Sequence, residues 1–213
     1  MDKIELHNTL PYVFEGRDVQ SDIWLQDVIF QKGETILVEA SSGTGKSSLC
    51  SYIIGYRKDY LGNILFDGKD IRQHSVSDWT SIRQHALSLL FQELRLFPEL
   101  TALENVQIKN ELTNHKNIKE IEDWFERLGI ADKMGAKIGR MSFGQQQRVA
   151  MIRALVQPFD FLMVDEPISH LDDENSAIMA EIMMEEARNQ GAGVIVTSIG
   201  KHMNLFYDKT YLL

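Results

Sequence analysis

The residues best suited to chemistry form a short run of small side chains around one lysine: Ser41, Ser42, Gly43, Thr44, Gly45, Lys46, Ser47 and Ser48. Glycines let a backbone curl so that successive N–H groups converge on phosphate oxygens. We expect Lys46 to reach the β- and γ-phosphates of a nucleotide and the Ser47 hydroxyl to bind Mg²⁺. The usual motif has glycine where this chain has Ala40. A loop that merely turns a strand into a helix is the alternative, but the order of strand, loop, Lys-Ser and helix favours nucleotide binding.

A second candidate is the acidic pair Asp165-Glu166, which directly follows the apolar run 161–164. In a parallel sheet, ligands bind beyond the carboxyl ends of the strands. Asp165 is therefore expected near the glycine loop, where it holds Mg²⁺ directly or through water. Glu166 is expected one step further out, where it polarises a water for in-line attack on the γ-phosphate. Alone, the pair also fits a strand that ends in solvent; with the loop upstream, it indicates nucleotide hydrolysis.

These residues need a sheet and helices to position them. Apolar runs predict strands over 23–30, 36–38, 161–164 and 194–197, and a hairpin strand over 64–66 between two turns. Helical spacing predicts a helix after the loop (Leu49, Tyr52, Ile53, Tyr56), one from Ile118 that stops at Gly129, and helices over 149–156 and 173–190. Thr101 and Glu104 form a predicted capping box. Strand–helix alternation at both ends predicts an α/β core with a mainly parallel sheet and a helical insertion.

The composition limits the function classes. The 213 residues are 44% hydrophobic and 25% charged, which is typical of a globular domain. A net charge of −9 argues against general nucleic-acid binding. The single cysteine, Cys50, excludes an internal disulfide and a cysteine-rich metal site, and fits a reducing compartment. Charged residues at the N-terminus do not fit a signal peptide, and no apolar run approaches the ~20 residues that span a bilayer.

A third segment discriminates among nucleotide-binding folds. The run 141–150, Met-Ser-Phe-Gly-Gln-Gln-Gln-Arg-Val-Ala, closely resembles the signature sequence of ATP-binding-cassette (ABC) ATPases, Leu-Ser-Gly-Gly-Gln before a helix. Residues 89–92 (Leu-Leu-Phe-Gln) resemble the Q-loop of that family, and Ser169-His170-Leu171-Asp172 resembles its D-loop. Residues 96–101 and 104–106 resemble the branch that drives lipoprotein release, macrolide export and cell-division complexes. The resemblance extends from about residue 23 to residue 197.

The resemblance implies the fold and the domain plan. It implies a P-loop NTPase core of ABC ATPase type, with a mainly parallel sheet, an N-terminal antiparallel β subdomain and an inserted α-helical subdomain. The whole chain, 1–213, is then a single ABC ATPase domain. Residues of about 1–92 and 141–213 form the core with the β subdomain, and residues of about 93–140 form the helical subdomain.

The resemblance also implies roles for individual residues. Residues 41–48 bind ATP, and Lys46, Gln92 and Glu166 are the catalytic residues, with Glu166 as the general base. Ser47, Gln92 and Asp165 serve Mg²⁺. The residues implied to contact the ATP of a second subunit are Ser142, Phe143, Gly144 and Gln145, and Asp172 helps to order that opposite site. Phe14 is expected to stack on adenine, with Tyr12 as the next choice; either could equally be a core residue.

Two departures from the family pattern bear on activity. Phe143 replaces the first signature glycine. After the strand 194–197 the family has a histidine that contacts the γ-phosphate, whereas this chain reads Ser198-Ile199-Gly200-Lys201-His202. Isoleucine cannot donate a hydrogen bond, and His202 is expected to be a surface residue. We therefore expect hydrolysis that is slow or depends on a partner.

These patterns favour an ATP-hydrolysing subunit of an ABC-type membrane complex. The implied partners are a second ATPase subunit, as a homodimer, and a separate transmembrane permease-like protein docked near residues 93–97. The chain is then cytoplasmic and peripheral on the inner face of the membrane. The alternative is a non-transport ABC ATPase that acts as a mechanical or regulatory switch with slow hydrolysis. A soluble ATPase that acts on DNA or ribosomes is disfavoured by the charge of −9 and by the lack of a coiled-coil insertion or a second cassette.

Overall fold

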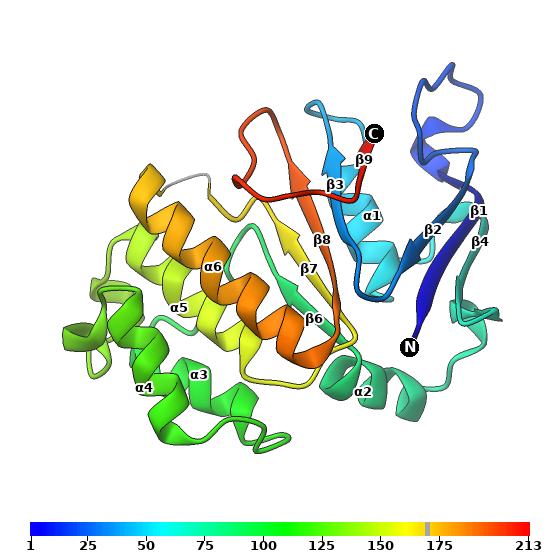
Figure 1. Cartoon of the computed structure of the whole chain (residues 1–213). Helices are drawn as coiled ribbons and strands as arrows, with labels where there is room; N and C mark the ends of the chain where they lie inside the picture. Colours follow the sequence, from blue (N-terminus) through cyan, green and yellow to red (C-terminus); the bar gives the residue numbers. More distant parts are fainter. Residues whose placement is uncertain (169–170) are drawn as a thin grey trace.

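The computed structural model of the chain describes residues 1–168 and 171–213, and it arranges them as two sheets with helices packed around them (Figure 1). The larger sheet has the order β6-β7-β8-β3-β9, and all its neighbouring strands are parallel. Its strands are β3 (Thr35–Glu39), β6 (Leu87–Leu90), β7 (Phe161–Asp165), β8 (Gly193–Ser198) and β9 (Lys209–Leu212). The strands β7 and β8 are buried along their whole length, which explains their continuous apolar sequences.

The smaller sheet is antiparallel and has the order β2-β1-β4-β5. Its strands are β1 (Lys3–Pro11), β2 (Asp27–Gln31), β4 (Tyr60–Phe66) and β5 (Lys69–Asp70). The helix α1 (Lys46–Ile53) packs with this sheet and one face of the larger sheet around a common hydrophobic core. The predicted fold class, a mainly parallel α/β core with an antiparallel β subdomain and a helical segment, is confirmed.

The other face of the larger sheet is covered by two long helices, α5 (Phe143–Leu155) and α6 (Asp173–Gln190) (Figure 1). Beyond them lie α3 (Ala102–Asn110) and α4 (Ile118–Arg127), whose buried faces share a second core with α5 and α6. The helix α2 (Val76–His85) precedes β6. Short 3₁₀ helices complete the fold: η1 (Tyr12–Phe14), η2 (Ile71–Gln73), η3 (Ala131–Lys133) and η4 (Ile138–Arg140).

Polar side chains begin most of these helices. The helices α2, α3, α4 and α5 start with capping boxes, in which two side chains satisfy each other's free backbone N–H groups. The predicted box of Thr101 and Glu104 is among them. The predicted ends of the helix from Ile118 and of the helix over 173–190 are also confirmed. None of the helices in the described ranges is long and apolar enough to cross a membrane.

Two local predictions were wrong. The predicted strand over 23–30 begins only at Asp27, because the Ser21 hydroxyl accepts hydrogen bonds from the Ile23 and Trp24 N–H groups and turns the chain there. Ile23 and Trp24 are apolar because they belong to the core, not to a strand. Tyr56 does not extend the face of α1, which ends at Ile53.

The helix α1 ends because Gly55 has a left-handed φ of +72°, and the Tyr56 N–H turns back to donate to the Ser51 carbonyl at 2.8 Å. At Gly55 any side chain would meet the ring of Trp79, since a Cβ atom there would lie 2.4 Å from it. Beyond this close contact Tyr56 is exposed, and its ring stacks on that of Phe91 with centroids 6.1 Å apart.

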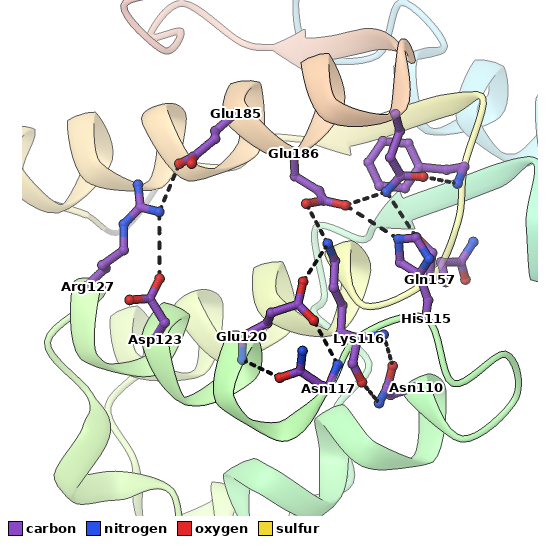
Figure 2. A network of polar contacts seen from close by, with 12 residues as sticks. Asn110, His115, Lys116, Asn117, Glu120, Asp123, Arg127, Gln157, Glu185 and Glu186 are labelled. Atoms are coloured by element: carbon purple, nitrogen blue, oxygen red, sulfur yellow. Dashed lines mark hydrogen bonds and ion pairs between the residues drawn. The ribbon is translucent and has the colours of Figure 1, made fainter.

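A polar network joins the segment before α4 to α6 (Figure 2). The Lys116 Nζ atom donates to Glu186 at 2.9 Å, and Gln190 donates to the same carboxylate at 2.6 Å. Both side chains of the Lys116–Glu186 pair are almost fully buried. Arg127 on α4 pairs with Glu185 on α6 at the surface. This network fixes how α4 lies on the core; the predicted boundaries of a helical subdomain at about 93–140 stay a prediction.

Candidate active site

The glycine loop connects β3 to α1 at the carboxyl edge of the parallel sheet. Gly45 caps α1 with a φ of +99°, a conformation that favours glycine, and a Cβ there would lie 3.0 Å from the Phe14 ring. The Trp24 indole donates to the Thr44 carbonyl at 2.8 Å, and the Thr44 hydroxyl donates to the Ser41 carbonyl at 2.9 Å. These two hydrogen bonds fix the backbone of the loop. The first N–H groups of α1 have no partner within the helix. This arrangement suits an anion.

Lys46 joins the loop to the acidic pair. Its buried Nζ atom lies 2.6 Å from the Asp165 carboxylate and 2.5 Å from that of Glu166. Burial alone would lower the pKa of Lys46, but the hydrogen bonds to Asp165 and Glu166 outweigh it, and the pKa is raised. The ammonium group therefore stays charged at neutral pH, and it neutralises two carboxylates at the point where the sequence predicts a triphosphate.

Glu166 is held in an unusual backbone conformation. Its φ of +49° lies in the left-handed region, which costs a non-glycine residue about 1–2 kcal/mol. Its N–H donates to the Thr197 carbonyl at 3.1 Å on the neighbouring strand β8. The Gln92 side chain, two residues beyond β6, donates to the Glu166 carboxylate at 3.1 Å. The structure thus brings Lys46, Gln92, Asp165 and Glu166 together, although they are far apart in the sequence.

The predicted magnesium ligands are compatible with a hard cation. Ser47 and Asp165 line the same cavity, of about 60 Å³, and Gln92 reaches the carboxylate next to it. A hydroxyl, an amide oxygen and a carboxylate are oxygen donors of the kind that Mg²⁺ prefers. Within residues 1–168 and 171–213, no group of three or more His, Cys, Asp or Glu side chains forms a metal site. The donor set with Ser47 and Gln92 stays a prediction.

The signature segment forms the start of α5. The Ser142 hydroxyl accepts from the Gln145 N–H at 3.3 Å, and the Gln145 side chain accepts from the Ser142 N–H at 3.0 Å. Ser142 therefore caps the helix. The Gly144 carbonyl accepts from Arg148. Ser142 and Phe143 are exposed, so the segment presents a surface at the N-terminal end of a helix.

Asp172 caps α6 by accepting a hydrogen bond from the Asn175 N–H at 2.8 Å. This backbone hydrogen bond, together with one from the Asn175 side chain, lowers the pKa of Asp172. Asn175 in turn accepts from Arg148 at 2.9 Å, which ties this end of the predicted D-loop to α5. Ser169 and His170, the first two residues of that loop, lie outside the described residues.

The predicted adenine contact lies beside the glycine loop. Phe14 in η1 is partly buried against Gly45, and the Arg17 guanidinium lies 5.8 Å from its ring centroid. Phe14 lines a cavity of about 270 Å³ together with Arg17, Gly43 and Thr44. Tyr12, the second choice, is half exposed. The position of Phe14 is compatible with stacking on a base, which stays a prediction.

The segment after β8 lacks the family's histidine, and the last residue of the strand, Ser198, bonds to this segment. Ser198 is buried, and its hydroxyl donates to the Lys201 carbonyl at 2.5 Å. Ile199 is exposed. His202 lies 3.5 Å from Glu39 at the end of β3, with its ring edge-on to Tyr207, and its side chain is 42% exposed. His202 is thus a surface residue paired with Glu39.

Sequence reasoning missed two residues that hold the acidic pair. The Thr197 hydroxyl donates to the Asp165 carboxylate at 2.6 Å, and the Gln147 side chain donates to the backbone carbonyls of Glu166 and Pro167. A signal for Thr197 was available: it ends an apolar run, as Asp165 does, and the two are register partners in neighbouring strands. Gln147 looked like one of three similar glutamines, and the sequence held no sign of its partner.

Comparisons with known proteins agree with this geometry. Residues 26–169 match the family described as ABC transporter. The chain is 31% identical to the lipoprotein-releasing system ATP-binding protein of Geobacter metallireducens, over 85% of this chain and 82% of that protein. It is 28% identical to a macrolide export ATP-binding/permease protein of a Shewanella species, over 84% of this chain and 27% of that protein. A solved dimeric ATP-binding cassette in a post-hydrolysis state, bound to ADP and Pi, superimposes with a TM-score of 0.74 at 26% identity, covering 92% of this chain and 87% of the other.

Proposed function

The chain belongs to the ABC transporter family, and from this premise we propose that it is an ATPase subunit that energises a separate membrane protein through ATP-driven dimerisation. The observation that carries the proposal is the cluster of Lys46, Asp165 and Glu166 beside a glycine loop at the edge of a parallel sheet. That cluster combines a cation for phosphates with two carboxylates, one of which can act as a general base.

The chain's residues divide the work of hydrolysis. Lys46 exchanges its carboxylate partners for the phosphate oxygens of ATP, and this exchange releases Glu166 to accept a proton from the attacking water. Gln92, which holds Glu166 at 3.1 Å, orients that carboxylate and the water. Ser47, Gln92 and Asp165 would hold Mg²⁺, which would offset the negative charge of the phosphates.

A second copy of the chain completes each site. Ser142, Phe143, Gly144 and Gln145 begin α5, and we assign them to the ATP of the partner copy, because the N-terminal end of a helix attracts an anion. The dimeric state of the superimposable cassette supports this arrangement. In such a dimer Phe143 takes part in the interface, where the family has a small residue.

The membrane partner is proposed to dock in an apolar groove next to the Q-loop. A cavity of about 280 Å³ is lined by Tyr56, Phe91, Arg95, Phe97 and Ile108, three of which are large apolar residues exposed by 44–51%. Arg95 lies over the rings of both Phe91 and Tyr56. Gln92 belongs to the same segment, so a movement of the groove also moves the side chain that holds Glu166. We infer that the chain works at the cytoplasmic face of a membrane through this partner.

The alternative of a non-transport switch is not favoured. The similar proteins carry the names of a lipoprotein-releasing system and of a macrolide exporter, both of which are transport systems. The missing histidine after β8 concerns the rate of hydrolysis and does not by itself point to another function.

Phosphate release by the purified protein tests the proposal. We expect measurable release that needs Mg²⁺ and that falls on the order of 10²–10⁴-fold in a Glu166→Gln variant, the usual contribution of a general base. Glu122→Gln, an exposed glutamate on α4, is the matched control and should keep the wild-type rate. Equal rates for the wild type and Glu166→Gln would remove Glu166 from the mechanism.

A further inference from the structure

The first half of α5 carries four consecutive polar side chains with different partners: Gln145, Gln146, Gln147 and Arg148. Gln145 closes the cap with Ser142, and Gln146 donates to the carbonyls of Ile138 and Met141 at 3.2 and 3.0 Å. Gln147 donates to the Glu166 carbonyl at 3.4 Å and, more closely, to the Pro167 carbonyl. One helical turn beyond the proposed contact with the partner's ATP, α5 therefore touches the backbone of this chain's own general base.

This contact acts on the strained residue of the site. The left-handed backbone of Glu166 persists only if its surroundings hold it. Thr197 holds its N–H from β8, and Gln147 holds its C=O from α5. With both backbone groups fixed, the direction of the Glu166 side chain depends on where α5 lies.

The position of Gln147 allows it to couple the position of α5 to that of Glu166. The side chain is buried to 98%, so it moves only with the helix. Its Nε2 atom makes the two hydrogen bonds, while its Oε1 atom is buried without a hydrogen-bond partner among the described residues. A residue kept only for packing would not need a buried amide with an unsatisfied oxygen, which costs about 1–3 kcal/mol.

The neighbouring Arg148 makes a parallel link. It donates to Asn175 at 2.9 Å, and Asn175 donates to Asp172 at 2.8–2.9 Å. The start of α5 thus holds the segment after β7 at Glu166-Pro167 and again at Asp172. A displacement of α5 shifts both points together.

We propose that Gln147 is a positioning residue for Glu166, which couples the signature surface of a chain to the general base of the same chain. ATP held by the partner copy against Ser142–Gln145 fixes the position of α5. Through its hydrogen bond to the Glu166 carbonyl, Gln147 then fixes the position of Glu166. Each chain's base is then placed for catalysis only when the opposite site is filled. This inference rests on the proposed function, since it needs the ATP-bound dimer.

The test separates hydrolysis from dimer formation. In Gln147→Met, which keeps the length of the side chain and removes both donors, kcat for phosphate release is expected to fall about 10–100-fold, the scale of a small misplacement of a reacting group. The dependence of the rate on ATP concentration is expected to lose its cooperativity. Combined with Glu166→Gln, the same change should leave dimerisation in Mg-ATP as it is in Glu166→Gln alone.

The matched control is Gln146→Met, which removes two similar hydrogen bonds from the adjacent residue but leaves Glu166 untouched, and it should keep the wild-type kcat. Wild-type kcat in Gln147→Met overturns the inference. So does a joint loss of kcat and dimerisation, because that pattern means that Gln147 merely supports the fold of the signature. Should Gln147→Met unfold, Gln147→Leu is measured in its place. A wild-type protein that neither dimerises nor hydrolyses ATP contradicts the proposed function itself, irrespective of Gln147.

Discussion

At the scale of single residues, the site is organised by hydrogen bonds between neighbouring parallel strands. Asp165 ends β7 and Thr197 nearly ends β8, and their register places the hydroxyl 2.6 Å from the carboxylate. Both residues are buried. A buried carboxylate needs every donor that it can obtain, because an unpaired buried charge is costly. Thr197 therefore fixes the orientation of Asp165, which we propose to serve Mg²⁺.

We predict that Thr197→Val raises the Mg²⁺ concentration for half-maximal phosphate release about tenfold. Valine has the same shape but no donor, and a hydrogen bond to a charged group is worth about 1.5–3 kcal/mol. Thr197→Ser keeps the hydroxyl and should stay within a factor of two or so of the wild type. An unchanged magnesium titration of the valine variant would show that Thr197 does not position Asp165.

The location of the site could be predicted from the sequence, but the side-chain contacts between its distant segments could not. The glycine loop and the acidic pair are local patterns whose spacing reflects the strand–loop–helix and strand-end geometry behind them. The contacts of Lys46 with Glu166 and of Gln147 with Pro167 join segments up to about 120 residues apart, and they depend on the order of the strands in the sheet. The catalytic and binding roles of the predicted residues stay predictions.

At the scale of elements, the features that could be predicted are those set by residues close together in the sequence. The capping box of Thr101 and Glu104 and the stop at Gly129 depend on four or five neighbouring residues, and both were predicted where they occur. The strand predicted at 23–30 failed because a buried turn and a buried strand have the same apolar composition. The prediction for Tyr56 failed because Gly55 has a left-handed φ of +72°, which ends the helix before Tyr56.

The β4–β5 hairpin offers a pH-dependent prediction. Side-chain hydrogen bonds from Arg72 are the main reason why the pKa of Asp70 is lowered to about 2, and Asn63 on β4 also donates to it at 2.8 Å. A carboxyl whose pKa is lower in the folded state stabilises the fold above its unfolded pKa of ~3.9 and loses that effect as the pH falls towards the folded value.

We therefore predict that Asp70→Asn lowers the free energy of unfolding by about 1–2 kcal/mol at pH 7. The difference from the wild type should shrink as the pH falls from ~4 to ~2, where the wild-type carboxyl also loses its charge. Urea unfolding followed across this range measures it. A difference that stays constant with pH would mean that the charge of Asp70 does not stabilise the hairpin.

At the scale of the whole molecule, buried charges hold α4 and the segment before it on the core. Glu186 accepts from Lys116 and Gln190 inside the interface between α4 and α6 (Figure 2). We predict that Glu186→Leu destabilises the protein by about 3–5 kcal/mol, since it removes the buried anion of the Lys116 ammonium and leaves only the more exposed Glu120, 3.4 Å away. Glu185→Leu, one residue earlier on the same helix, removes a half-exposed pair with Arg127 and should cost less than about 1 kcal/mol.

Chemical unfolding of both variants checks this prediction. In the double variant Lys116→Met with Glu186→Leu, part of the lost stability should return, because no uncompensated charge is left. Equal costs for Glu186→Leu and Glu185→Leu would contradict the view that the buried pair holds the two parts together.

The central claim is that ATP is gripped by one chain and sealed by a second. The most direct measurement is the molecular mass of the Glu166→Gln variant in solution, with and without Mg-ATP, together with the nucleotide that it retains. We predict a shift from 24.4 kDa to twice that mass, with ATP bound, and no shift when Lys46→Ala is added. A protein that stays monomeric and retains no nucleotide in Mg-ATP would contradict the account.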